Sequence, residues 1–194
     1  MNPNKVFTFA INKLSTDLKP ELIYHSVFHT LDVYRTVEKL AKSEKLNKTD
    51  SDIVKTAALM HDIGFISQYK DHEEVSAEFA RKHLPDFEYT SEEIELVASI
   101  IMKTKLPQNA VTLTEKILCD ADLDYLGRPD FFIISHKLRL EWEKTGIQKL
   151  RLKEWYQMQY KFLSEHRFFT QSSIKLREKT KQKNIAEIKV LLDL

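Results

Sequence analysis

An all-helical fold is predicted by three features of this 194-residue sequence. Long segments repeat apolar residues at helical spacing, only three glycines and five prolines are present, and no region is rich in strand-forming residues. With 42% hydrophobic residues the chain can bury one core, and its length makes two ordinary domains an unlikely default. We therefore expect a single domain over residues 1–194.

Apolar spacing and capping residues place the first three helices. The first helix should end before Pro20, and the second should run over residues 21–46. The third should begin in the segment NKTDSD and end at Gly64. This placement puts His61 and Asp62 in the last turn of the third helix.

Three pairs with capping-box spacing mark the starts of the next helices. The pairs are Asp71 with Glu74, Thr90 with Glu93, and Thr112 with Glu115. The first of these helices should end near Leu84, and the last should end at Leu126 because Gly127 and Pro129 follow. Beyond them, FFIISHKLRLEWEKTG, KLRLKEWYQMQYKFLSEH and a lysine-rich final segment ending in IAEIKVLLDL predict further helices.

The charge balance argues against binding a nucleic-acid polymer or a membrane surface. Thirty basic and twenty-nine acidic residues give a formal charge of +1. Cys119 is the single cysteine, and no segment predicts a signal peptide or a membrane span. We expect a soluble, cytoplasmic protein; a homodimer formed through the last helices is left open, because periodicity does not separate it from internal packing.

Two motifs place histidines and a carboxylate on inward faces. In YHSVFHTLDV, His25 and His29 are four residues apart and would share one face of the second helix. In AALMHDIGF, His61 lies in line with the small apolar residue Ala57, so the pair with Asp62 should face the core. An unpaired buried carboxylate is costly unless a cation or hydrogen bonds compensate it.

The segment TEKILCDADLDYLG carries three aspartates, which helical angles of about 100° per residue separate. Asp122 falls on a mostly apolar face with Leu118. Asp120 and Asp124 fall with Lys116 on the opposite face, where solvent would satisfy them. Asp122 is therefore the aspartate that needs a partner, with Asp120 as the alternative.

Two imidazoles and two carboxylates would together suit one divalent cation, with water in the open positions. The four residues are His29, His61, Asp62 and Asp122. The donor set admits Mn, Mg, Fe, Zn, Ni or Co. The chemistry predicted is hydrolysis, with Asp62 at the reacting centre and His25 acting as a general acid or binding a phosphate oxygen.

These motifs resemble the HD-domain metal-dependent phosphohydrolases, whose pattern is a histidine, a His-Asp doublet and a distant aspartate. YHSVFHTLDV, AALMHDIGF and CDADLDYLG carry the resemblance, which is greatest to predicted phosphohydrolases with YHN, HE and DADL motifs. It covers about residues 20–145 and extends more weakly through residues 146–194. The implied architecture is an HD-type metal-binding core over residues 20–145 with a C-terminal helical extension packed on it.

Residue by residue, the resemblance implies metal binding by His29, His61, Asp62 and Asp122. His25 matches the first histidine of the YHN motif, which protonates the leaving oxygen in the related cyclic-nucleotide phosphodiesterases. Ser26 stands where that motif has asparagine.

Four further residues are candidates for binding substrate or a second ion. His72 and Glu73 resemble the histidine and glutamate that serve a second metal or a phosphate pocket in family members, although a helix start also explains them. Thr104 and Arg128 are candidates for substrate binding, the latter because a guanidinium can hold two phosphate oxygens. The aromatic residues of the C-terminal third are interpreted as core or lid packing.

The sequence thus predicts a phosphohydrolase that uses a metal-activated water on a small-molecule phosphate ester or nucleotide. A cyclic-nucleotide or nucleotide pyrophosphate hydrolase is the nearest alternative. A non-catalytic nucleotide or metal sensor with an HD fold, and a purely structural ion, remain as rivals of a different class.

Overall fold

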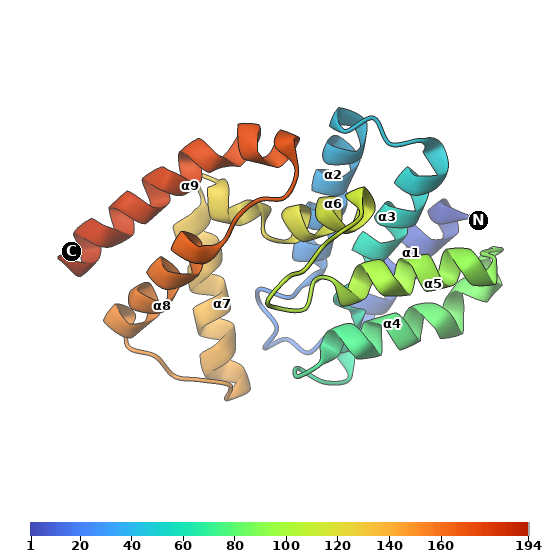
Figure 1. The fold of residues 1–194 in the computed structure, drawn as a ribbon. Coiled ribbons are helices and arrows are strands. Elements are labelled where there is room, and N and C mark those ends of the chain that lie inside the picture. Colours follow the sequence, from blue (N-terminus) through green and yellow to red (C-terminus); the bar gives the residue numbers. More distant parts are fainter. Residues whose placement is uncertain (194) are drawn as a thin grey trace.

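The computed structural model describes residues 1–193, and all regular structure in that range is helical, as predicted (Figure 1). Its α-helices are α1 (Pro3–Asp17), α2 (Val27–Ser43), α3 (Lys48–Met60), α4 (His72–His83), α5 (Ser91–Met102), α6 (Leu113–Asp122), α7 (Phe131–Thr145), α8 (Leu152–Glu165) and α9 (Gln171–Leu192). Short 3-10 helices follow α3, α4 and α6, namely η1 (Ile63–Ile66), η2 (Leu84–Phe87) and η3 (Asp124–Gly127). Among the described helices, none combines the length and apolarity needed to cross a membrane.

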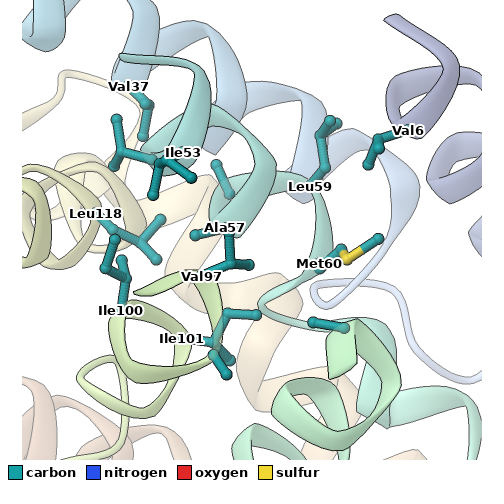
Figure 2. Packing of buried hydrophobic residues seen from close by; sticks show 14 of the residues in the cluster. Val6, Val37, Ile53, Ala57, Leu59, Met60, Val97, Ile100, Ile101 and Leu118 are labelled. Atoms are coloured by element: carbon teal, nitrogen blue, oxygen red, sulfur yellow. The ribbon is translucent and has the colours of Figure 1, made fainter. Parts of the chain in front are cut away.

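Helix α3 is the centre of the first hydrophobic core. It packs against α1, α2, α5 and α6, and Val54, Ala57 and Ala58 have no exposed surface. Small side chains at two successive positions let the neighbouring helices approach closely, and larger residues fill the remaining space. Figure 2 shows this packing, with Val6, Val37, Ile53, Leu59, Met60, Val97, Ile100, Ile101 and Leu118 around Ala57.

Helices α7, α8 and α9 form a second hydrophobic core with η3, to one side of the first core (Figure 1). Trp155 and Phe131 are fully buried at its centre. Along the chain, Ala121 is the last buried residue of the first core, and buried residues of the second core follow from Leu123 onward. The predicted division into residues 20–145 and 146–194 stays a prediction.

The predicted second helix begins too early. Helix α2 starts at Val27, and residues 20–26 form turns, so His25 and His29 do not share a helical face. The reason is a tertiary contact: the backbone N–H groups of Tyr24 and His25 donate to the Glu141 carboxylate at 2.7 and 2.9 Å. A buried charge from α7 therefore holds the backbone that the sequence pattern assigned to a helix.

The third helix ends at Met60 rather than at Gly64. His61 is its C-cap, and Asp62 leaves helical geometry with φ −105° and ψ 4°. Gly64 has a packing role instead, because a Cβ atom there would lie 2.1 Å from the carbonyl oxygen of His72. Its N–H donates to Ser76 Oγ at 2.9 Å, so the backbone of η1 lies directly against α4.

Two of the three predicted capping boxes form. Thr90 and Thr112 cap α5 and α6 reciprocally with the glutamates three residues later. Asp71 does not cap α4: it adopts φ 54°, and its carboxylate instead binds Lys105 at 2.7 Å. Helix α6 ends at Asp122, four residues before the predicted end, and η3 continues to Gly127.

Candidate functional site

Four predicted ligands converge where α2, α3 and α6 meet. His29 lies in α2, His61 and Asp62 follow α3, and Asp122 is the last residue of α6. His29 Nε2 lies 3.2 Å from Asp122 Oδ1 and 3.3 Å from Asp62 Oδ2. His61 Nε2 lies 3.3 Å from Asp62 Oδ2 and 3.5 Å from Asp122 Oδ1. Ligand atoms of His29, His61 and Asp122 all lie within 4.8 Å of one another, so they could hold a metal ion.

The orientation of the His61 ring suits metal binding. Its Nδ1 donates to the Ala58 carbonyl at 2.8 Å, which leaves the Nε2 lone pair directed at the carboxylates. His61 Nε2 and Asp62 Oδ2 are buried, and although they lie 3.3 Å apart, neither forms a hydrogen bond of suitable geometry with any described residue. Because orphaned buried polar atoms are costly, the residues fit a cation that would bind both atoms.

The electrostatics of the cluster keep both carboxylates ionised. Burial alone would raise the pKa of Asp122, but His29 and His61 lower it to about 2. Burial also opposes ionisation of Asp62, yet its neighbour His61 holds the pKa of that carboxyl well below its usual value. In the metal-free protein the carboxylates outweigh burial and raise the pKa of His61, so a cation would displace protons when it binds.

His25 lies beside this cluster and is held by a carboxylate that the sequence analysis missed. Its Nδ1 forms a very short contact with Glu141 Oε1, and its ring stacks on Phe65 with centroids 4.0 Å apart. Tyr69 Oη donates to the same Glu141 oxygen at 2.9 Å. With Nδ1 engaged, Nε2 is the ring nitrogen left for a ligand.

The cluster opens into a cavity of about 410 Å³ between the two cores. The residues before α7 contribute its ionic groups together with apolar side chains such as Phe65 and Leu106, whereas α7 and α8 contribute mainly apolar side chains. The former include His25, Asp62, His72, Glu73, Thr104, Lys105 and Asp122; the latter include Leu138, Trp142, Met158 and Phe162, together with Gln159. This size lies within the range of small-molecule sites.

Helix α4 presents two predicted residues to the cavity. His72 is not exposed: its Nε2 lies 3.5 Å from Asp62 Oδ1, and its Nδ1 lies 3.6 Å from Glu73 Oε2. Burial lowers and Asp62 raises the pKa of His72, with a net rise. Thr104 is also buried on the lining, where its hydroxyl donates to the Ile101 carbonyl at 2.8 Å.

Arg128 is not placed to receive a substrate phosphate. Its guanidinium binds Asp130 at 2.9 and 2.6 Å and Asp32 at 2.5 Å, and it is absent from the cavity lining. Local sequence patterns could not predict this arrangement, because the carboxylates that bind the guanidinium come from both α2 (Asp32) and the segment after η3 (Asp130). Three nitrogen donors are thereby committed to carboxylates of the protein.

Asp120 and Asp124 are buried, which contradicts their predicted solvation. Asp120 accepts hydrogen bonds from the backbone N–H groups of Phe169 and Thr170 at 2.7 and 2.8 Å, and from the Thr170 hydroxyl at 2.7 Å. Arg177 binds both oxygens of Asp124 at 2.6 and 2.8 Å. The C-terminal segment covers this face of α6, so Asp120 is occupied away from the His/Asp cluster.

The missed residues share a signal that was available in the sequence. Glu141 lies at helical spacing from Phe131 and Leu138, and Gln159 lies at helical spacing from Trp155 and Leu163. A polar residue on an apolar helix face was the observation that ranked Asp122 first. The same test on α7 and α8 selects Glu141 and Gln159.

Solved structures share this fold over nearly the whole chain. A predicted HD superfamily hydrolase from an uncultured Thermotogales bacterium is 21% identical, with a TM-score of 0.64 over 98% of this chain and 91% of that one. Bacillus subtilis YpgQ in complex with ADP is 17% identical, with a TM-score of 0.68 over 98% and 96%. Lin1889 from Listeria innocua is 20% identical, with a TM-score of 0.66 over 100% and 99%. At these identities the likeness shows the fold alone.

Sequence comparison identifies the family. An uncharacterized protein of Clostridium beijerinckii is 35% identical over 81 residues, which is 40% of this chain, and the match spans about half (51%) of that relative's length. The HD domain model matches residues 27–124, half of the chain, a range that includes the His/Asp cluster of His29, His61, Asp62 and Asp122. The chain therefore belongs to the HD domain family.

Proposed function

We propose that this protein is a metal-dependent phosphohydrolase acting on a small-molecule phosphate ester or nucleotide. The observation that carries the proposal is the pair of orphaned buried atoms, His61 Nε2 and Asp62 Oδ2, at the wall of a ligand-sized cavity. Membership of the HD domain family and the fold shared with a predicted hydrolase support hydrolysis. The ADP bound by YpgQ makes a nucleotide a reasonable ligand class.

In this proposal the cation is held by His29, His61, Asp62 and Asp122. A divalent cation there would polarise a phosphoryl oxygen and lower the pKa of a bound water. The mixed nitrogen and oxygen donor set is compatible with Mn, Mg, Fe, Zn, Ni or Co. Asp120 is the weaker alternative, because both of its oxygens already accept hydrogen bonds from Phe169 and Thr170.

His25 is proposed as the general acid. Glu141 holds Nδ1 of His25, so the opposite nitrogen can give its proton to the leaving oxygen of a substrate in the cavity. Asp62 is proposed to orient the attacking water and to accept its proton with the carboxylate oxygen that does not bind the cation, since the residue lines the cavity.

The side chains of His72 and Glu73 are proposed to form a second metal or phosphate subsite. Both lie in the first turn of α4 and line the cavity beside Asp62. The positive end of that helix and the raised pKa of His72 favour an anionic group. Thr104 is proposed to contact the substrate from the same side of the cavity, whereas the bonds of Arg128 to Asp32 and Asp130 do not favour Arg128 in this role.

The test is turnover of a panel of phosphate esters and nucleotides by metal-stripped protein to which single divalent ions are returned. We expect metal-dependent hydrolysis, and we expect Asp62→Asn to lower kcat by about 10³-fold, since such a cation supplies several kcal/mol. Asp86→Asn is the matched control, because Asp86 is exposed and remote from the cluster. The cation content of each protein is measured by mass spectrometry.

Three outcomes separate the proposal from its rivals. Bound cation without turnover of any panel member would favour a nucleotide or metal sensor. Full activity in Asp62→Asn would refute the catalytic assignment. A cation that neither exchanges nor admits water in its coordination sphere would indicate a structural ion.

A further inference from the structure

The side of the cavity opposite the His/Asp cluster carries one polar group with an unmet hydrogen-bonding need. Gln159 lies on α8 among apolar lining residues and is 4% exposed. Its Oε1 is buried and accepts no hydrogen bond from the described part of the chain. A buried amide oxygen without a hydrogen-bond partner destabilises the unliganded protein. A ligand that donates a hydrogen bond to this oxygen would remove that free-energy penalty.

Another buried amide shows that the fold can satisfy such a group. Asn184 is also 4% exposed, and its Nδ2 donates to the Leu126 and Arg128 carbonyls at 3.0 Å each. Asn184 packs between α9 and η3, whereas Gln159 lines a cavity. The two amides therefore differ in that the Gln159 side chain lines a cavity large enough for a ligand.

We infer that Gln159 binds the edge of an adenine base, in a nucleotide whose phosphates lie at the His/Asp cluster. Oε1 requires a donor, and the amide nitrogen beside it can donate to an acceptor. Adenine offers this pair, an exocyclic amino group next to a ring nitrogen, and glutamine is suited to bind both at once. Phosphate oxygens are acceptors only and cannot satisfy Oε1.

The walls around Gln159 suit a flat base. Trp142 and Phe162 are half-buried and line the cavity from α7 and α8, with Leu138 and Met158 between the same helices. Aromatic and thioether side chains bind the faces of bases well, while the glutamine reads an edge. For Trp142 and Phe162, contact with a base replaces the interpretation of these aromatic residues as core or lid packing.

This inference rests on the proposed function for the position of the phosphates, but its test is a binding measurement. Dissociation constants are measured calorimetrically for AMP and for purine riboside 5′-monophosphate, which differs from AMP only in lacking the amino group. We expect AMP to bind the wild-type protein about tenfold more tightly or better. Equal affinities would overturn the assignment without any variant being needed.

Two leucine substitutions on the same helix supply the matched pair. Gln159→Leu should weaken AMP binding about tenfold and abolish the preference for the amino group, because leucine preserves bulk but offers no acceptor. Gln157→Leu should change neither quantity, since Gln157 is exposed two residues away. If Gln159→Leu does not fold, Gln159→Met provides the same test. A preference that survives either substitution at position 159 would assign the base to another part of the cavity.

Hydrolysis of p-nitrophenyl phosphate, which has no base, separates this inference from the proposed function. Metal-dependent turnover of that ester together with equal affinity for the two nucleotides would retain the hydrolase and reject the base site. A clear preference for AMP without hydrolysis of any phosphate ester would retain the base site and reject the hydrolase.

Discussion

The two hydrophobic cores contribute opposite chemistry to one cavity. Helices α1 to α6 place the His/Asp cluster, together with His72, on one wall. Helices α7 and α8 supply Trp142, Phe162 and the amide of Gln159 on the other wall. The charged cluster lies within the region that matches the HD domain model, and the apolar wall lies beyond it. The contrast suggests that reactivity and ligand choice are encoded in separate parts of the chain.

The two regions are nevertheless joined by buried carboxylates. Glu141, on α7 of the second core, binds His25, which precedes α2. Asp120, on α6, binds the backbone of Phe169 and Thr170, which precede α9. Breaking either contact should therefore show how far each region depends on the other.

Among the contacts that join the two cores, the largest effect is expected from Glu141→Gln. Glutamine can still accept hydrogen bonds from the backbone, but it replaces the carboxylate that contacts His25 Nδ1 with a neutral amide. We predict that kcat falls about 100-fold for a nucleotide or alkyl phosphate, whose leaving oxygen needs a proton. The fall should be less than about threefold for p-nitrophenyl phosphate, whose leaving group needs little protonation.

The contrast between the two leaving groups identifies a positioning role for Glu141. A merely structural role would lower both rates by the same factor, and an unchanged rate on the alkyl ester would contradict the assignment of His25 as the acid. His25→Gln is the companion variant and should reproduce the same selectivity. The cation content should equal that of the wild-type protein in both variants.

The next effect separates the two aspartates of α6. Asp120→Ala should lower the free energy of unfolding by about 3 kcal/mol, because two backbone donors and a hydroxyl lose a charged acceptor. Its cation content should not change. Asp122→Ala should show the reverse pattern, with lost cation and a smaller change in stability.

Denaturant unfolding and metal analysis on the same samples check this pair. Cation loss in Asp120→Ala with its stability intact would reassign the ligand to Asp120. The same result would contradict the assignment of Asp120 as the residue that attaches the C-terminal segment to α6.

The smallest effect concerns a half-buried histidine between α8 and α9. Neither ring nitrogen of His166 has a hydrogen-bond partner among the described residues, and burial, with help from Lys181, lowers its pKa to about 4. The unfolded chain, with an ordinary value near 6.5, binds more protons between pH 6.5 and 4. The free energy of unfolding should therefore decrease on acidification across this window, by on the order of 2 kcal/mol.

Chemical denaturation at several pH values tests this contribution. His166→Phe should remove this part of the pH dependence while leaving other titrating groups in place. An identical slope in the variant and the wild-type protein would show that His166 does not carry it. His61 provides the contrast, since neighbouring carboxylates raise its pKa, whereas at His166 burial and Lys181 outweigh the opposite influence of Glu178.

Local sequence patterns predicted the parts of the molecule that depend on neighbouring residues. The capping boxes at Thr90 and Thr112 form because their hydrogen bonds close within one turn. The inward direction of His61 and Asp122 followed from helical periodicity, and the structure brings them together. The sequence therefore determined the helical class and the charged cluster.

The tertiary structure decided what those residues meet. Glu141 pulls the chain before α2 out of the helix that its periodicity predicted, and the carboxylates around Arg128 remove it from the cavity. The segment from Phe169 buries Asp120, which periodicity alone left in solvent. Each of these contacts joins residues at least 49 positions apart, except the local contact of Arg128 with Asp130. Local propensity contains no information about such partners, so the cavity and its second wall could be determined only by the packed chain.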